Sequence, residues 1–471
     1  MDPLLGHAGQ GDGRVVIRAR NRFDFGVKSG RAAGRGTLAL VNTLSRLARR
    51  GGRAGELAAA AKTLFRREKG ERPESADELR GLALTLGLDA EDLAAARALA
   101  FSFMPTGCTN FGAVPPATGD GQTVVSWNFD VPFIFRLLMG RQPMFVRDIR
   151  GSIPYVCMGM PAFFGIGILN AEGLACAVNA VGVTDSGPGI SPFELNNIAM
   201  ETCGDVASAA AVHSEGPRRI LKALYTGILF NWNTIWGDTR GGLSVFECSH
   251  NHFHEERAGE RGCVASANHH QFLDRGLTGS VDPGSDLLIT GSYSRLARMY
   301  SLLDTYHGHI GPFASKLMVS DHIPDYSLLR EYGIEREWWE EKVDDSTICA
   351  HPWNMRRHLA KGEVYPALEE FTVSWTVYSF QVRPGRMTVW FTDGHPCRRP
   401  TTPYYWGRLL GSGGEPEPGG IDPGTGREAR PETARRGMFM RDTAGFPATV
   451  EKVIMGAVES VENSRFEKYG A

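Results

Sequence analysis

The sequence lacks several features that would assign it to a broad class at once. Its 471 residues include 51 basic and 53 acidic side chains, a net charge of −2. This balance argues against nucleic acid or an anionic membrane as the main partner. No run of 18 apolar residues occurs, so we expect no membrane-spanning segment. The N-terminal residues contain no apolar stretch followed by a small-residue cleavage site, so we expect no signal peptide.

Paired cysteines are also missing. The eight cysteines are scattered, and no Cys-x-x-Cys pair occurs. In a chain of this length, such usage is typical of a reducing compartment and not of a disulfide framework, so we expect a cytoplasmic protein. The glycines Gly165 and Gly167 are not followed by the third glycine of a dinucleotide-binding loop, and the sequence predicts no cofactor.

The stretch 105–130 carries the strongest functional signal. It begins with Gly107-Cys108-Thr109, continues through a turn-rich connector, and ends with Trp127-Asn128-Phe129-Asp130. Small and β-branched residues on both sides of the connector predict two strands joined by a loop. Alternation along the second strand would send Asn128 and Asp130 to one face. If the strands pair, Cys108 and this polar face come close together.

Cys108 has both a structural and a chemical interpretation. A free cysteine is often a small buried hydrophobe. Here, however, the residue before Cys108 is Gly107, which has no side chain, so its carbonyl is sterically open. The thiol can attack this carbonyl and move the acyl group from nitrogen to sulfur. Hydrolysis of that thioester would free an α-amino group, which titrates near pH 7.7–8.0. Such an amine can act as the general base for the thiol of its own residue.

At this point the chain resembles a known family. Gly-Cys-Thr followed about twenty residues later by Asn-x-Asp is similar to the isopenicillin-N acyltransferase type of autoproteolytic N-terminal nucleophile (Ntn) hydrolase, the acyl-coenzyme A:6-aminopenicillanic acid acyltransferase family. The Asn-Ala-Glu-Gly-Leu turn at 170–174 and the Ala-Asn-His step at 267–269 add to the resemblance. It implies an α+β fold, a four-layer αββα sandwich with a helical N-terminal segment. It also implies cleavage between Gly107 and Cys108, which would give chains of 107 and 364 residues.

The resemblance also implies roles for polar residues. Asp130 would orient and polarise the freed amine; its alternative role is an ordinary strand-end cap. Asn128 is the weaker candidate of the pair and can be purely structural. Asn268 and Asn179 would donate hydrogen bonds to an oxyanion, because amide side chains present N–H groups without a competing positive charge. A satisfied buried asparagine is the alternative for both.

The family has an arginine in its late hairpin, and two residues of this chain lie near that position. Arg383 and Arg386 flank a predicted turn between strands at 371–380 and 387–391. The resemblance does not decide between them. Residues of turns are normally solvated, which is the alternative for each.

A second constellation suggests a metal site. If the run from Cys248 were a strand, one face would carry Cys248, His250, His252, His254 and Glu256. Thiolate, imidazole and carboxylate groups all suit zinc. The sequence offers no spaced second set of ligands, and a polar strand that runs into a loop is the alternative. His269 and His270 are the place to look for further ligands.

We therefore divide the chain into four parts. Residues 1–107 form a helical segment that is released as a separate chain but kept in the fold, and residues 108–410 form the catalytic region. Residues 411–437 form a flexible loop rich in glycine and proline. Residues 438–471 contain a C-terminal helix that can dock back or support self-association.

The expected function is that of a self-cleaving cysteine enzyme. It would act on amide or thioester bonds of small N-acyl compounds or peptides, by hydrolysis or by acyl transfer through a Cys108 acyl-enzyme. The expected partner is a small-molecule substrate, with acyl-coenzyme A as one candidate, and neither nucleic acid nor a membrane. Two alternatives stay open: a metal-dependent hydrolase built on the histidine run, and a non-catalytic relative that never cleaves.

Overall fold

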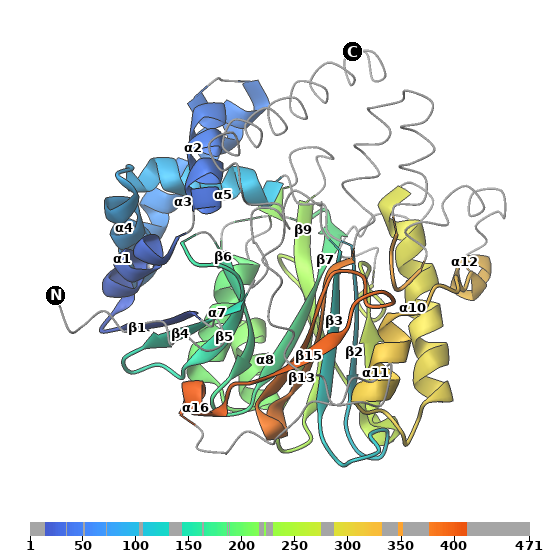
Figure 1. Cartoon of the computed structure of the whole chain (residues 1–471). Helices are drawn as coiled ribbons and strands as arrows, with labels where there is room; N and C mark the ends of the chain where they lie inside the picture. The colour runs from blue at the N-terminus through green and yellow to red at the C-terminus, as the bar shows by residue number, and fades with distance from the viewer. Residues whose placement is uncertain are drawn as a thin grey trace, which may run out of the picture.

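Two β-sheets occupy the centre of the molecule, with helices around them (Figure 1). The structure is a computed structural model. It describes residues 15–33, 35–49, 52–71, 73–102, 107–130, 144–162, 164–185, 187, 189–215, 221–222, 229–274, 287–331, 347–351 and 376–411. The predicted loop at 411–437, apart from its first residue, and the predicted C-terminal helix at 438–471 lie outside these ranges. None of the helices within them combines the length and apolar character needed to cross a lipid bilayer.

The larger sheet contains strands from both sides of Cys108. Its order is β1 (Val15–Ala19), β4 (Met144–Ile149), β5 (Tyr155–Met160), β6 (Phe164–Asn170), β7 (Ala175–Val183), β9 (Leu229–Gly237), β10 (Leu243–Cys248) and β11 (Phe253–Arg257), with β8 (Leu221–Lys222) beside β9. β1 runs parallel to β4, and the pairs that follow are antiparallel. The sheet therefore joins the N-terminal segment to the predicted catalytic region.

The smaller sheet contains the stretch around Cys108. Its order is β12 (Cys263–Ser266), β2 (Gly107–Ala113), β3 (Val124–Asp130), β13 (Thr376–Arg383), β14 (Thr388–Asp393) and β15 (Thr401–Tyr405). The predicted pairing of the two strands around the connector is confirmed: Gly107 lies opposite Asp130, and Cys108 lies opposite Phe129. The late hairpin is also confirmed, with a 3₁₀ turn at Pro384–Arg386.

The two sheets pack face to face. β2 and β3 contact β7 and β9, and the buried Trp127, Phe129 and Trp236 belong to one apolar cluster. Glycine makes this approach possible, since a Cβ on Gly112 would lie 2.4 Å from a Leu243 methyl group. A larger residue there would overpack the interface, which typically costs about 1–3 kcal/mol.

Helices cover the outer faces of both sheets. α7 (Pro192–Thr202) and α8 (Val206–Glu215) contact the larger sheet, whereas α10 (Leu287–Thr305) and α11 (Pro312–Val319) contact the smaller one. The short helices α12 (Ser327–Glu331) and α16 (Gly407–Leu410) complete this part of the chain. The combination of helices with two largely antiparallel sheets is the α+β class that the sequence predicted.

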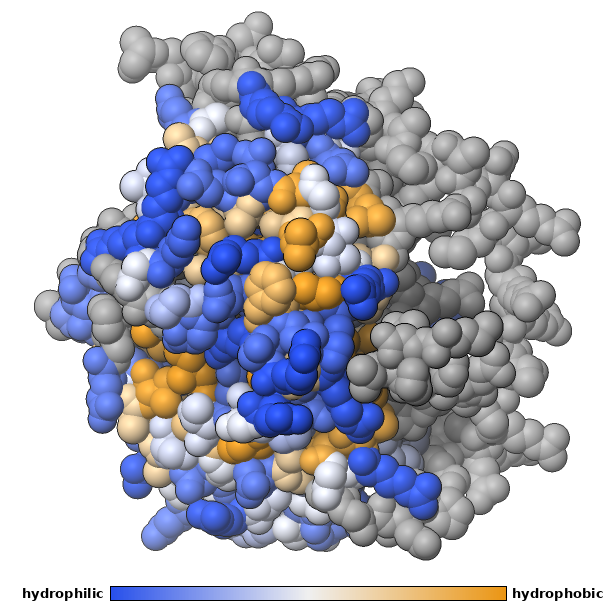
Figure 2. Space-filling view, turned by 90° about the vertical axis from the view of Figure 1, so that its left-hand side faces the viewer, coloured by the Kyte–Doolittle hydropathy of each residue, from blue (hydrophilic) through white to orange (hydrophobic). Residues whose placement is uncertain are grey.

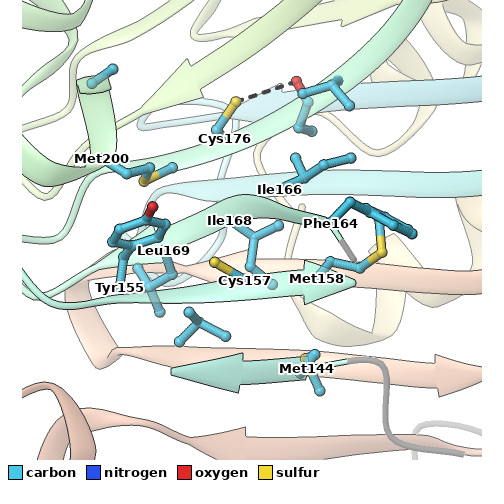
Figure 3. Close-up of a cluster of buried hydrophobic side chains, with 14 of the residues drawn as sticks. Met144, Tyr155, Cys157, Met158, Phe164, Ile166, Ile168, Leu169, Cys176 and Met200 are labelled. Atoms are coloured by element: carbon cyan, nitrogen blue, oxygen red, sulfur yellow. Dashed lines mark hydrogen bonds between the residues drawn. The ribbon is translucent and has the colours of Figure 1, made fainter. Parts of the chain in front are cut away.

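Local sequence explains where α7 begins and what it buries. Its N-cap is Ser191, whose hydroxyl accepts a hydrogen bond from the backbone N–H of Glu194, and Pro192 occupies the first turn. Figure 3 shows Met200 of α7 above Tyr155 and Leu169 of the larger sheet, within a cluster of apolar side chains. Its members are almost fully buried, so this cluster fixes the helix against the sheet.

The helical N-terminal segment is confirmed. It contains α1 (Arg22–Ala32), α2 (Arg35–Arg49), α3 (Gly52–Glu71), α4 (Pro73–Leu86) and α5 (Ala90–Ser102). Asp89 caps α5, since its carboxylate accepts from the backbone N–H of Glu91 at 2.7 Å. The charged run from Arg66 continues α3 to Glu71. Arginine, lysine and glutamate in this run are good helix formers.

Figure 2 shows the side of the molecule that carries α1 and α4. Hydrophilic residues cover most of this face, and hydrophobic residues form separate patches between them. Leu84 of α4 is 68% exposed and Phe23 of α1 is 37% exposed. Single exposed apolar side chains of this kind are usual on a folded surface and call for no partner.

An ion-pair network joins the N-terminal helices to the sheet. Arg147 of β4 is buried and donates to Glu78 of α4 at 2.8 Å and to Glu201 of α7 at 2.9 Å. Arg22 of α1 also pairs with Glu201. Burial acts to raise the pKa of Glu78, but the charge and hydrogen bonds of Arg147 outweigh it and hold this pKa below its ordinary value. The segment before Cys108 is thus fixed to the rest of the protein by buried charge as well as by β1.

Candidate active site

Cys108 is the second residue of β2 and is buried between the sheets. Its side chain belongs to the same apolar cluster as Trp127 and Phe129. The pKa of the thiol is raised to about 12, mainly by burial and also by the Asp130 carboxylate, whereas Trp127 and the nearby Arg295 act in the opposite direction. In the uncut chain the thiol is therefore neutral near pH 7 and needs a base before it can act as a nucleophile.

The backbone nitrogen of Cys108 has a specific partner. It donates to Oδ1 of Asn268 at 2.9 Å. The same oxygen accepts from Nη2 of Arg295 at 2.6 Å, and Nδ2 of Asn268 donates to the carbonyl of Ala180 at 2.9 Å. Two donors on one oxygen fix which way the amide points. Asn268 therefore presents an acceptor to the atom that would become the α-amine.

Arg295 is a site residue that the sequence did not reveal. It lies on α10, is 3% exposed, and also donates from Nε to the Thr109 hydroxyl at 3.0 Å. It thus contacts the residue after Cys108 and the amide that holds the Cys108 nitrogen. The available signal was weak: an arginine beside Tyr293 and Leu296 in a largely apolar helix. Arg295 reaches Thr109 and Asn268 only because α10 packs against β2.

Asn179 supplies a second polar group between the sheets. It is fully buried on β7, and its Oδ1 accepts from Nδ2 of Asn110 at 2.6 Å. Asn110 is two residues from Cys108 on the same strand face. Within the described residues, Nδ2 of Asn179 has no hydrogen-bond partner. A buried amide donor without a partner is costly, and this one lies one residue from Ala180, which Asn268 contacts.

Asp130 and Asn128 differ in their surroundings. Asp130 ends β3 opposite Gly107, is 1% exposed, and is close enough to Cys108 for its charge to affect the pKa of the thiol. Asn128 donates from Nδ2 to the carbonyls of Val319 and Ile348, each at 3.0 Å. The geometry thus places Asp130 opposite Gly107 and beside Cys108, whereas Asn128 ties β3 to its neighbours.

Arg383 and Arg386 lie at the far end of the smaller sheet. Arg383 follows Val382, which pairs with Val125. At the usual rise per residue this end of β3 is about 20 Å from Asp130. Arg383 is also buried and pairs with Asp120, so it is not a solvated turn residue. The structure does not bring either arginine to Cys108.

The metal-site hypothesis required one strand from Cys248 to Glu256, and the structure shows instead the alternative, a strand that runs into a loop. β10 ends at Cys248 and β11 begins at Phe253, so a turn separates them and contains His250 and His252. The Asp185 carboxylate stabilises this turn, because it accepts from the Ser249 hydroxyl and from the backbone N–H groups of residues 250 and 251, at 2.7 to 3.1 Å. His254 instead lies 3.2 Å from Glu256.

His269 does not extend that constellation either. Its ring stacks on Tyr293 with centroids 3.8 Å apart, and its Nδ1 lies 2.7 Å from the Ser292 hydroxyl. Among the described residues, the histidines and cysteines that do converge are others, namely His322, Cys349, His351 and Cys397. The histidine run therefore forms no metal centre in this part of the chain.

Comparison with known proteins gives weak structural likenesses. No protein-family model matches the sequence, and no curated protein matches it. Two structures of conjugated bile acid hydrolase from Clostridium perfringens, both altered forms, are 11% identical with a TM-score of 0.35, covering 65% of this chain and 95% of theirs. Penicillin V acylase from Agrobacterium tumefaciens is 14% identical with a TM-score of 0.33, covering 61% and 83%.

Proposed function

We propose that this protein is a cysteine N-terminal nucleophile enzyme that cleaves its own chain before Cys108 and then acts on amide bonds of small N-acyl compounds or peptides. The observation that carries the proposal is the hydrogen bond from the Cys108 nitrogen to Asn268, beside the buried Arg295. A structural cysteine requires no such arrangement around its backbone nitrogen. The proposal includes the four-layer αββα arrangement, which the helices on the outer face of each sheet support.

Self-cleavage would proceed by an N-to-S acyl shift. The Cys108 thiol attacks the Gly107 carbonyl carbon, the C–N bond breaks, and the thiol proton passes to the nitrogen. Water then hydrolyses the thioester, which gives a Gly107 carboxylate, a free Cys108 thiol and a free α-amine. Asp130, opposite Gly107 in the ladder, stabilises the protonated amine as it forms.

After cleavage, turnover of substrate would use the free amine and thiol of Cys108 together with Asn179 and Asn268. The Cys108 amine takes the thiol proton, and the thiolate attacks the substrate carbonyl to form an acyl-enzyme. Nδ2 of Asn179 donates to the oxyanion, while Oδ1 of Asn268 orients the amine. This assignment differs from the expected oxyanion role of Asn268, because its Nδ2 donates to the carbonyl of Ala180 and its acceptor oxygen faces the Cys108 nitrogen.

The acceptor of the acyl group defines hydrolysis or transfer. Water gives a hydrolase, whereas an amine gives an acyltransferase, and acyl-coenzyme A is one candidate donor for the latter. We propose hydrolysis as the basic reaction, since it needs no second binding site. Product analysis with and without an added acceptor amine separates the two reactions: a new amide that forms at the expense of free acid would identify a transferase.

The decisive experiment is the mass of the purified full chain under denaturing conditions. We expect fragments of about 12 and about 40 kDa, in proportion to 107 and 364 of 471 residues and a total of 51.4 kDa. Cys108→Ala should remain a single inactive chain, and Cys203→Ser, a buried cysteine on a different element, should be processed normally. Cleavage or amidase activity in Cys108→Ala would overturn the proposal.

A further inference from the structure

Four metal-ligating side chains converge at a place that the sequence did not reveal. Their ligand atoms all lie within 4.8 Å of one another. They come from three segments: His322 after α11, Cys349 and His351 in the segment 347–351, and Cys397 after β14. Cys349 and His351 are buried, whereas His322 and Cys397 are exposed.

Hydrogen bonding alone does not account for this convergence. Nε2 of His351 lies 3.1 Å from Nε2 of His322, 3.1 Å from Sγ of Cys397 and 3.5 Å from Sγ of Cys349. A ring nitrogen of histidine has a single hydrogen or a single lone pair, so it serves one such neighbour well. The three neighbours of His351 Nε2 therefore indicate that the lone pairs of all four ligand atoms point toward a shared cation.

We propose that His322, Cys349, His351 and Cys397 bind a tetrahedral zinc ion. A zinc ion with bonds of about 2.3 Å to sulfur and about 2.0 Å to nitrogen separates its ligand atoms by about 3.3 to 3.8 Å. The contacts of His351, 3.1 to 3.5 Å, lie close to that range. Two thiolates and two neutral imidazoles would balance the divalent charge, and soft sulfur with imidazole favours zinc over magnesium or calcium.

The surroundings indicate a structural site. Four protein ligands leave no open position for substrate. The residue before His322 is held firmly, since Asp321 accepts two hydrogen bonds from Arg298 at 2.9 and 2.8 Å and its carbonyl accepts from the Cys349 N–H at 3.0 Å. The ring of His395 stacks on His351 with centroids 4.0 Å apart.

The site would also support the strand that carries Asp130. The carbonyl of Ile348, beside Cys349, accepts from Asn128 at 3.0 Å. A zinc ion here would fix the segment 347–351 against the end of β3, where cleavage is proposed.

The test is metal analysis of the full chain, purified without chelators and supplied with zinc. We expect one zinc ion per chain. Because His322 and Cys397 are exposed, His322→Ala and Cys397→Ser should fold, and each should weaken zinc binding at least about tenfold. His309→Ala is the matched control, because it also removes an exposed histidine but not one of the four ligands. This variant should bind zinc normally.

Cobalt gives a readout that needs no variant. Cobalt bound to two thiolates should show intense sulfur-to-metal absorption in the wild-type protein, and Cys397→Ser should reduce it. The same titration on Cys108→Ala separates this site from the proposed catalysis, because zinc binding should persist there. Absence of bound zinc and of the cobalt absorption, or a Cys349–Cys397 disulfide in the mass spectrum of freshly purified protein, would overturn the site.

Discussion

The backbone nitrogen of Cys108 donates a hydrogen bond to Oδ1 of Asn268, which is 160 positions away in the chain. The atom that would become the α-amine is thus already bound to its partner in the uncut chain. Arg295 donates to the same oxygen and fixes its orientation. The proposed site is already organised in the intact chain, so little rearrangement would separate a precursor from the proposed mature enzyme.

Removing the acceptor at Asn268 should slow both reactions. Asn268→Leu leaves the Cys108 nitrogen without its partner, and we expect cleavage and turnover to fall by about 10²- to 10³-fold. The fraction of cut chain over time and kcat/KM measure the two effects. The control is Asn251→Leu, an exposed turn residue, which should behave as wild type; an Asn268→Leu protein with normal kcat/KM would contradict the assignment.

Arg295 should act as a positioning residue. Arg295→Met removes the donors to Asn268 and Thr109, and we expect kcat to fall by about tenfold or more, because the amide loses the contact that orients it. Arg295→Lys keeps the charge and should recover part of that loss. A purely structural role predicts instead that both variants lose stability while the kcat of the folded fraction stays unchanged.

Loss of the Asn179 donor should reduce kcat without a large change in KM. We expect about a 10²- to 10³-fold decrease for Asn179→Ala, the usual effect of removing one oxyanion donor. Steady-state kinetics on a small N-acyl amide measures it. Asn170→Ala is the control, since it removes a buried asparagine bonded to the carbonyls of Met200 and Cys203. That variant should lower the melting temperature but keep kcat.

The rate of self-cleavage should rise with pH. Because the pKa of the buried Cys108 thiol is raised to about 12, the thiolate fraction should grow about tenfold per pH unit between roughly pH 7 and 10. The cut fraction after refolding of denatured precursor at each pH would show this trend. A plateau below pH 9 would indicate that the thiol has an ordinary pKa or that another group limits the step.

Acid should weaken the attachment of the N-terminal segment. The pKa of Glu78 is lowered in the folded protein from an ordinary value of 4.5, so its ion pair with Arg147 contributes fully above that pH and is lost as the pH falls through the folded pKa. We expect the two cut chains to co-elute in size-exclusion chromatography at pH 7 and to dissociate only at a pH below the ordinary value of 4.5.

A substitution tests the same attachment at neutral pH. Arg147→Met leaves Glu78 and Glu201 without their buried partner, and we expect a loss of about 3–5 kcal/mol in the free energy of unfolding. Arg18→Met is the matched control, because Arg18 pairs with Asp148 on the surface, where an ion pair contributes about 1 kcal/mol or less.

Local pattern predicted the strands around Cys108 well, because alternation and turn residues are short-range signals. The pairing of Gly107 with Asp130 follows from the connector between their strands. The proximity of Asn268 to Cys108 came from the family resemblance. Nothing within a short window of sequence indicates it.

What the sequence did not reveal depends on long-range packing. Arg295 gains its role only where α10 lies against β2. The fold alone brings the four proposed zinc ligands together, since His322 and Cys397 are far from Cys349 in the chain. The histidine run does not form the hypothesised metal site, because its alternating pattern passes through a turn. Asp185, from a distant loop, stabilises that turn.

The pairing of β1 with β4 gives the N-terminal segment a protective role. β4 would otherwise present a row of free backbone donors and acceptors at the border of the larger sheet, and such a border can recruit strands from other molecules. A cut chain that kept its first fragment would remain shielded. Loss of that fragment would expose the edge of β4 and favour pairing between the sheet edges of different molecules, so the segment would protect the protein against aggregation.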